Sequence, residues 1–292
     1  LAPASQFAAN LAGATNNTFG GTIAGSANII SGNTNDGIAM QNAGVMNDTV
    51  GQWNGESNAN DSILSNNGTW TGTEAYTTGK LGNAMSFNGS SYVTLPNEAI
   101  YDFAGLVFSV EGWFRTSTTG VRQMIVTKGT TANYQWNIEV QSTNVLSVGF
   151  NSATTIVYKK ESTQTVTDGQ WHHFAAVFDT RTASENLTVY LDGVTQTTVL
   201  SDSRTTIDYN SAGSQPVLIG ARGDGFNFTG AIDEVSILGR SLTAEEVRQI
   251  YITGGQSKYG NIFYGNTIGR NAANTADLGN GLAGIEAYNS SN

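Results

Sequence analysis

Three short phrases from the first fifty residues return near the C-terminal end of the chain. Asn-Ile-Ile-Ser-Gly-Asn-Thr at 28–34 returns as Asn-Ile-Phe-Tyr-Gly-Asn-Thr at 261–267, and Asn-Thr-Phe-Gly at 17–20 returns as Asn-Thr-Ile-Gly at 266–269. Gly32-Asn33 followed by Gly37-Ile38 returns as Gly279-Asn280 followed by Gly284-Ile285. Phrases of one repeat on both sides of a long middle segment predict that a second domain interrupts a repeat array.

Each phrase joins a short apolar run to Gly or Asn. Such a run fits a β-strand of about three residues that points one aliphatic side chain inward, with Gly or Asn turning the corner in a left-handed conformation. The chain has 35 Gly and only 3 Pro, so its turns rely on Gly and Asn. A coil of this kind cannot bury its own faces and needs neighbours above and below it.

The middle of the chain has a different texture. Longer alternating runs of aromatic and β-branched residues are separated by Gly, Asn, Ser and Thr turns, which is typical of a β-sandwich. One helix is expected over 244–251, where Thr243 and Glu246 form a capping box and Val247 and Ile250 face the sandwich. The expected strands are 84–87, 92–95, 108–115, 124–128, 134–140, 145–150, 173–179, 187–191, 217–219 and 231–237.

Composition excludes several partners and chemistries. The formal charge of −10 repels phosphate backbones and anionic lipid heads, so nucleic acid is not an expected partner. The sequence has no run of about 18 apolar residues, so membrane insertion is not expected either. The absence of cysteine removes disulfides and thiolate chemistry, and favours a bacterial or archaeal surface protein among secreted ones. The opening residues do not form an intact signal peptide, so either a leader has been removed or the chain is a piece of a longer protein.

The middle segment resembles the laminin-G-like family of concanavalin-A-like jelly rolls. Its phrases appear in order across about two hundred residues, and include Gly79-Lys80-Leu81-Gly82-Asn83-Ala84-Met85-Ser86-Phe87-Asn88-Gly89, Ser109-Val110-Glu111-Gly112-Trp113-Phe114, Gln170-Trp171-His172-His173-Phe174, Tyr190-Leu191-Asp192-Gly193 and Gly230-Ala231-Ile232-Asp233-Glu234-Val235. The resemblance implies a two-sheet antiparallel sandwich, and it leaves function open because this fold carries lectins, adhesins, enzymes and spacers.

The two ends resemble the right-handed parallel β-helix repeats of large secreted bacterial surface proteins. Asn-Asn-Thr-Phe-Gly-Gly at 16–21 and Leu-Gly-Asn-Gly-Leu-Ala-Gly-Ile at 278–285 carry this resemblance. The expected fold is therefore all-β, with β-helix coils over 1–49 and 254–292 and a jelly roll over 50–253 inserted between them. The last residues, 285–292, lead naturally into the phrase at 16–18 of a following copy, so end-to-end self-association is expected as one possibility.

A calcium ion is the chief cofactor that the laminin-G-like resemblance implies. It points to Asp61, Asn88 and Asp233 as ligands, near the place where the first and last strands meet. Carboxylate and carbonyl oxygens are the ligands that Ca²⁺ takes. The alternative is that Asp61 and Asp233 cap turns or pair with Arg240.

Aromatic residues outside the family phrases are candidates for stacking on a sugar. These are Trp70, Tyr134 and Trp136, whereas Trp53, Trp113 and Trp171 are expected to pack in the core. His172 and His173 are adjacent on a strand and point to opposite faces, so they do not share a metal easily. One is expected to hydrogen-bond a turn and the other to lie on the surface.

No catalytic residues are predicted. A glycosidase needs two carboxyls about 5 to 10 Å apart, and the Glu-x-Asp-x-x-Glu pattern of enzymes in this superfamily is absent from the sequence. We therefore expect a non-catalytic extracellular module for adhesion, in which a jelly roll carried on a β-helical stalk recognises a glycan or a cell-surface protein. The alternative is a structural subunit of a filament, sheath or layer that assembles through its β-helix ends. A polysaccharide-degrading enzyme ranks below both.

Overall fold

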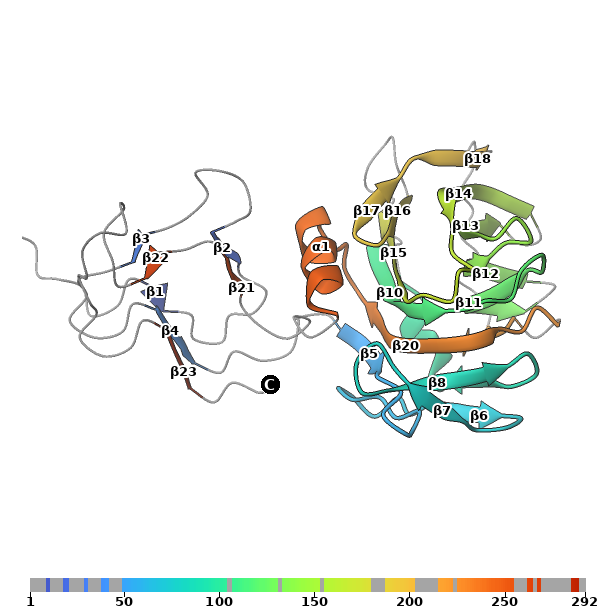
Figure 1. The fold of residues 1–292 in the computed structure, drawn as a ribbon, viewed down its shortest axis with the longest axis horizontal. Coiled ribbons are helices and arrows are strands. Elements are labelled where there is room, and N and C mark those ends of the chain that lie inside the picture. Colours follow the sequence, from blue (N-terminus) through green and yellow to red (C-terminus); the bar gives the residue numbers. More distant parts are fainter. Residues whose placement is uncertain are drawn as a thin grey trace, which may run out of the picture. The chain divides into compact units, whose positions relative to one another are not determined.

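The computed structural model describes residues 9–10, 18–20, 29–30, 38–41, 49–103, 107–130, 133–152, 155–179, 187–202, 215–222, 225–254, 262–264, 267–268 and 285–288. The chain forms two compact units (Figure 1). The first joins Leu1–Asn47 to Gln256–Asn292, and the second is Asp48–Gly255. Segments far apart in sequence thus build one unit, while a continuous stretch of chain builds the other.

Parallel pairing joins the two ends of the chain in the first unit. β4 lies between β1 and β23, β2 pairs with β21, and β3 pairs with β22. Three strands are thus followed by three strands that pair with them in the same order, and then by β23. The strands are β1 (Ala9–Asn10), β2 (Thr18–Gly20), β3 (Ile29–Ile30), β4 (Ile38–Gln41), β21 (Ile262–Tyr264), β22 (Thr267–Ile268) and β23 (Ile285–Tyr288).

The pairing register agrees with one of the three repeated phrases and differs from the other two. Ile38 pairs with Ile285, as the third phrase suggests. Ile29, however, pairs with Thr267, and Thr18 pairs with Ile262, so the first two phrases are displaced by one strand. The strands of this unit have similar sequences, each a short run followed by Gly or a polar residue. Sequence similarity alone therefore does not identify which strand pairs with which.

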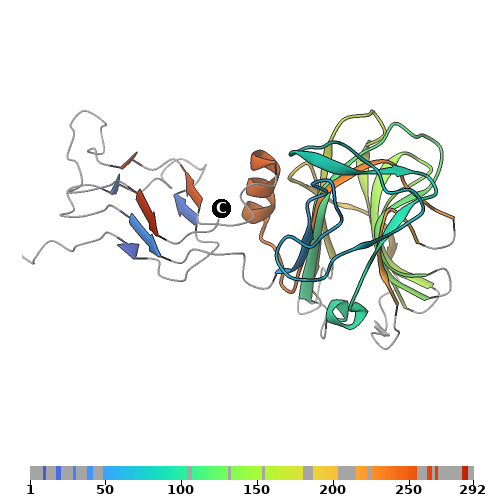
Figure 2. The same cartoon turned by 90° about the horizontal axis from the view of Figure 1, so that it is seen from below.

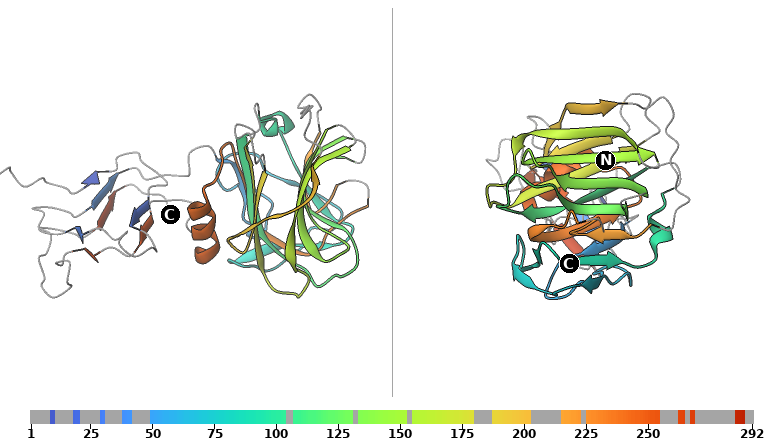
Figure 3. Two further views of the ribbon diagram at one scale, coloured as in Figure 1. Left: turned by 90° about the horizontal axis from the view of Figure 1, so that it is seen from above. Right: turned by 90° about the vertical axis from the view of Figure 1, so that its right-hand side faces the viewer.

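The second unit is an antiparallel sandwich of two sheets that face each other (Figures 2 and 3). The first sheet has the order β17-β16-β15-β10-β20-β8-β7, with β5 also paired to β20, and the second has the order β18-β14-β13-β12-β11-β19-β9-β6. The first sheet consists of β5 (Thr49–Trp53), β7 (Tyr76–Thr78), β8 (Asn83–Asn88), β10 (Val107–Arg115), β15 (His172–Asp179), β16 (Leu187–Leu191), β17 (Val194–Gln196) and β20 (Thr229–Leu238). The second consists of β6 (Thr69–Thr71), β9 (Tyr92–Leu95), β11 (Gln123–Thr130), β12 (Asn133–Val140), β13 (Val145–Ser152), β14 (Thr155–Thr165), β18 (Thr198–Asp202) and β19 (Val217–Ile219).

Strict alternation along β10 explains how the first sheet forms the core. Phe108, Val110 and Phe114 belong to the hydrophobic cluster between the sheets, and Phe108 stacks on Phe178 with ring centroids 4.3 Å apart. Burial of each such side chain contributes about 1.5–3 kcal/mol to stability. The intervening residues, among them Trp113, lie on the outer face of the sheet.

Helix α1 (Ala244–Thr253) covers part of that outer face. Its predicted capping box is confirmed, because Glu246 N donates to Thr243 Oγ1 at 3.2 Å and Thr243 N donates to Glu246 Oε2 at 2.8 Å. Val247 and Ile250 are buried as expected, and Tyr251 stacks on Trp113 with centroids 5.8 Å apart. Within the described residues, no helix is long and apolar enough to span a membrane.

Each expected strand overlaps a strand of the structure, but six strands of the sandwich are absent from the strands predicted above, namely β5, β6, β7, β14, β17 and β18. The longest of the six is β14. It has 11 residues and is the longest described strand. Lys159, Lys160 and Glu161 make its middle look like a solvated loop in sequence. The structure instead places Lys159 and Glu161 in an ion pair of 3.0 Å and buries Lys160 at 2% exposure.

Candidate binding site

A row of four residues crosses the outer face of the first sheet beyond the part that Tyr251 covers. Arg115 at the end of β10 pairs with Ala231 in β20, and Ala231 pairs with Ser86 in β8. Trp171 directly precedes His172, the partner of Phe114, so Trp171 lies beside Arg115 on the other side. The row therefore places an aromatic ring, a cation, a small side chain and a hydroxyl next to one another.

Arg115, Ala231 and Ser86 of this row line a hollow with a volume of about 290 Å³. Six of its eleven lining residues carry a hydroxyl group, and Arg115 supplies a positive charge. The lining residues are Thr77, Ser86, Phe87, Arg115, Thr116, Ser117, Thr118, Gly169, Thr229, Gly230 and Ala231. The lining side chains offer hydroxyl donors and acceptors and one guanidinium, so the hollow is equipped for hydrogen bonding and charge pairing.

The wall after β10 is fixed by hydrogen bonds. Thr116 Oγ1 donates to Thr229 O at 2.7 Å and accepts from Thr118 N at 3.1 Å. The Gln123 carboxamide bridges the same two segments, because Nε2 donates to Thr118 O at 3.2 Å and Oε1 accepts from Thr229 N at 2.9 Å. Gly169 N donates to Thr116 O at 3.0 Å. The backbone of this wall and the Thr116 hydroxyl are thus held in place by hydrogen bonds within the protein.

The position of Arg115 depends on a glycine and an aromatic ring. Gly230 has φ +140°, and a Cβ there would lie 2.2 Å from Arg115 O, so only glycine lets the two strands approach. The Arg115 guanidinium carbon lies 4.9 Å from the ring centroid of Trp171. This cation–π contact keeps the guanidinium beside the half-buried ring.

A family model described as the concanavalin A-like lectin/glucanases superfamily matches residues 87–248. The chain belongs to this superfamily. No curated protein matches the chain.

Solved structures share the fold of the concanavalin A-like sandwich. Domain 4 of AbnA, an extracellular GH43 arabinanase from Geobacillus stearothermophilus, in complex with arabinotriose, matches with a TM-score of 0.53 and 21% identity, over 70% of this chain and 98% of that chain. The binding domain of Paraclostridial Mosquitocidal Protein 1 has a TM-score of 0.53 and 18% identity, over 70% of this chain and 52% of that chain. The binding domain of Botulinum neurotoxin DC, in complex with rat synaptotagmin II, has a TM-score of 0.53 and 12% identity, over 71% and 52% of the two chains. The match thus spans about half the length of these toxin chains, and these likenesses concern the fold.

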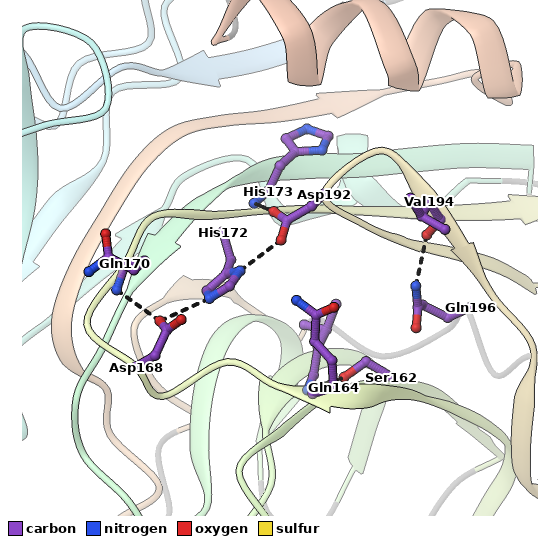
Figure 4. A network of polar contacts seen from close by, with 10 residues as sticks. Ser162, Gln164, Asp168, Gln170, His172, His173, Asp192, Val194 and Gln196 are labelled. Atoms are coloured by element: carbon purple, nitrogen blue, oxygen red, sulfur yellow. Dashed lines mark hydrogen bonds and ion pairs between the residues drawn. The ribbon is translucent and has the colours of Figure 1, made fainter.

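In this concanavalin A-like sandwich, the turn that carries Gly169 and Trp171 is anchored by His172 (Figure 4). His172 Nε2 lies 3.1 Å from Asp168 Oδ1, and Nδ1 lies 2.8 Å from Asp192 Oδ2. Both carboxylates are acceptors, and an imidazole donates through both nitrogens only when it is protonated. Burial lowers the pKa of His172, but the hydrogen bonds and charges of Asp192 and Asp168 outweigh burial, and the pKa is raised above its ordinary value.

The expectation that one of the two histidines lies on the surface is wrong. His172 is 6% exposed and His173 is 0% exposed. His173 lies on the outer face, where Nε2 is 3.3 Å from Glu111 Oε2 and the ring contacts Trp113. The outer face is covered at this point, which alternation along the strand does not reveal.

The three residues expected to bind calcium each hold a different turn. Asp61 accepts from the backbone N–H groups of Gln52, Ile63 and Asn66. Asp233 Oδ2 accepts from Lys80 N at 2.7 Å and from Leu81 N at 3.1 Å.

Asn88 Oδ1 accepts from the backbone N–H and side-chain hydroxyl groups of both Ser90 and Ser91. It pairs with Thr229, four residues before Asp233, so about 13 Å of strand separates Asn88 from Asp233. Among the residues that the structure describes, no group of three or more acidic, histidine or cysteine side chains is arranged to hold a metal ion. Arg240, which was the alternative partner expected for Asp61 and Asp233, forms an ion pair with Glu246 at 2.7 Å.

The three aromatic residues proposed for sugar stacking lie in different surroundings. Trp136 is 2% exposed in the core beside Phe108 and Phe178, so neither ring face is open to a sugar. Trp70 is half-buried against Phe87, and its Nε1 donates to the Tyr76 hydroxyl at 3.0 Å. Tyr134 lies in β12, and its side chain is outside the described residues.

The three tryptophans expected in the core also differ in burial. Trp53 and Trp113 are buried, but Trp171 is half-buried and contacts Arg115, which lines the hollow. Sequence reasoning therefore missed Trp171 and Arg115 as site residues. An arginine at an outward position at the end of a core strand is a signal in the sequence, but the aromatic partner beside it depends on strand pairing.

Proposed function

We propose that this protein is a non-catalytic extracellular recognition module whose sandwich binds a glycan in the hollow beside Arg115. The observation that carries the proposal is the lining of the hollow, in which six hydroxyl groups and a guanidinium meet without an acid or a base. Sugars present many hydroxyl groups in fixed directions, and a prearranged set of donors and acceptors binds them without reordering the protein. The arabinanase domain in complex with arabinotriose and the binding domains of Paraclostridial Mosquitocidal Protein 1 and Botulinum neurotoxin DC support this choice.

Glycan binding is tested by comparing the parent protein with Arg115→Ala and Arg248→Ala on a broad glycan array. Arg248 lies on α1 and pairs with Glu245 at 3.7 Å, so it is a matched surface arginine away from the hollow. We expect at least a tenfold loss of the strongest signal for Arg115→Ala and no loss for Arg248→Ala. Equal signals from all three proteins would place the glycan elsewhere, and no signal from the parent would remove the proposal.

The β-helical stalk remains part of the proposal for the first unit. The parallel ladders between β1, β4 and β23 and between the other two strand pairs support a stack of coils. Among the described strands, β1 and β23 each pair on one side only. An exposed strand edge is a template for another chain, and this observation favours the alternative function of a subunit that assembles end to end.

Sedimentation and electron microscopy separate the two functions, and the same samples with and without Ca²⁺ test the proposed ion. Assembly through the coils predicts regular fibres or arrays, whereas a recognition module predicts a monomer. Bound calcium predicts a rise in melting temperature when Ca²⁺ is added, and an unchanged melting temperature would remove the ion from the proposal.

A further inference from the structure

Arg115 is a half-buried cation without an acidic partner among the described residues, in a chain with 23 acidic and 13 basic residues. Arg122 and Arg240 show the usual arrangement, with a glutamate at 2.6 and 2.7 Å. Arg115 makes one hydrogen bond, from Nη2 to Thr78 O, and its length of 3.5 Å makes it weak. A guanidinium has five N–H donors, so most of its hydrogen-bonding capacity remains available.

We propose that the hollow binds the carboxylate of an acidic sugar, a uronic acid, and that Arg115 is the residue that selects it; this rests on the proposed glycan-binding function. The guanidinium edge matches the two oxygens of a carboxylate in a bidentate pair. The contact with the Trp171 ring adds no hydrogen bond to the guanidinium, so its N–H donors other than the weak one to Thr78 O are left for such a pair.

The remaining lining suits the rest of a sugar ring. Thr118 and Ser117 beside Arg115, and Ser86 and Thr77 on the opposite side, carry hydroxyl groups that donate to and accept from sugar hydroxyls. Ala231 lies between these two sides, and its methyl group is a buried, apolar part of the lining. One charged side chain and several neutral hydroxyl groups thus fit a single acidic sugar unit.

The net charge of the chain further restricts the class of glycan that can bind. A net charge of −10 repels a polyanion, and one arginine does not offset that repulsion. The ligand is therefore an isolated acidic sugar in an otherwise neutral glycan. Its affinity falls as salt is added, since one ion pair is screened.

The test is an NMR titration of the ¹⁵N-labelled protein, which reports on the Trp171 indole N–H and the Arg115 Nε–H. The probes are the methyl glycosides of glucuronate and galacturonate, their carboxymethyl esters, and methyl glucoside. Trp171→Phe and Arg115→Gln assign the two signals. We expect at least one uronide to shift both signals, its ester to bind at least tenfold more weakly, and Arg115→Gln to abolish the difference.

Two further variants separate charge from geometry. Arg115→Lys keeps the charge but loses the bidentate edge, so we expect at least fivefold weaker uronide binding, while Arg248→Gln binds as the parent does. Esters that shift the hollow signals as strongly as the acids would overturn the acidic-sugar proposal and leave glycan binding intact. If no uronide shifts either signal, the acidic-sugar proposal fails, and the glycan array decides the proposed function separately.

Discussion

At the scale of single residues, the site depends on positions that carry no chemistry of their own. Gly230 lets β20 approach Arg115 O, and Ala231, the pairing partner of Arg115, contributes only a methyl group to the lining of the hollow. The laminin-G-like phrase at 230–235 indicates the strand, but nothing in the sequence alone says that its glycine lies against the end of β10. Trp171 is a second residue whose role the sequence does not reveal. Its family phrase suggests that it packs in the core, but in the structure its ring lies beside Arg115 and supports the guanidinium.

Gly230→Ala tests this dependence. A Cβ at 2.2 Å from Arg115 O, together with φ +140°, forces the strands apart, so we expect about 3 kcal/mol lower unfolding free energy and weaker ligand binding. The matched control is Gly120→Ala, where φ is +74° and no atom lies within 4 Å of the added Cβ. Only about 1 kcal/mol is expected there. Urea denaturation measures both, and equal losses would contradict the proposed contact.

At the scale of elements, alternation and turn residues predicted most core strands and the helix with its cap. These patterns did not predict β14, because its lysines are paired or buried only through contacts in the folded protein. Lys128 in β11 is a similar case. It is fully buried, and its ammonium lies 3.1 Å from Glu98 O, Gln215 O and Asp102 Oδ1. A lysine inside a strand is read as a solvated residue unless the carbonyls around it are known.

The turn between β14 and β15 yields a prediction on pH. Because the pKa of His172 is raised in the folded protein, the stability that its two carboxylates supply is fully present below the ordinary pKa of 6.5. That stability is lost as pH rises through the folded-state pKa. The melting temperature of the parent should therefore fall, relative to His172→Gln, between about pH 6 and the folded-state pKa.

Asp168→Asn provides the matched variant for this measurement. It removes one of the two carboxylates that raise the pKa of His172, so the fall in melting temperature should move to lower pH. Parallel pH profiles for the parent and His172→Gln would show that His172 is not protonated at this turn. Ligand binding measured across the same range shows whether a looser turn at Gly169 and Trp171 also weakens the hollow.

At the scale of the whole molecule, the repeated phrases predicted an interrupted array. The structure pairs both ends of the chain in parallel and separates them from the sandwich as another compact unit. The predicted limits at 49/50 and 253/254, the handedness of the coils and the calcium ion remain predictions. What sequence patterns did not supply was the binding site, because the hollow collects residues from five separate segments of the chain.

The most direct test of the central claim is a crystal structure of the protein with the glycan that binds best on the array. We predict sugar density in the hollow, with a polar group of the ligand within hydrogen-bond distance of Arg115 and hydroxyl groups facing Thr118 or Ser86. Density confined to another surface, for example beside Trp70, with the hollow empty at saturating ligand, would contradict it.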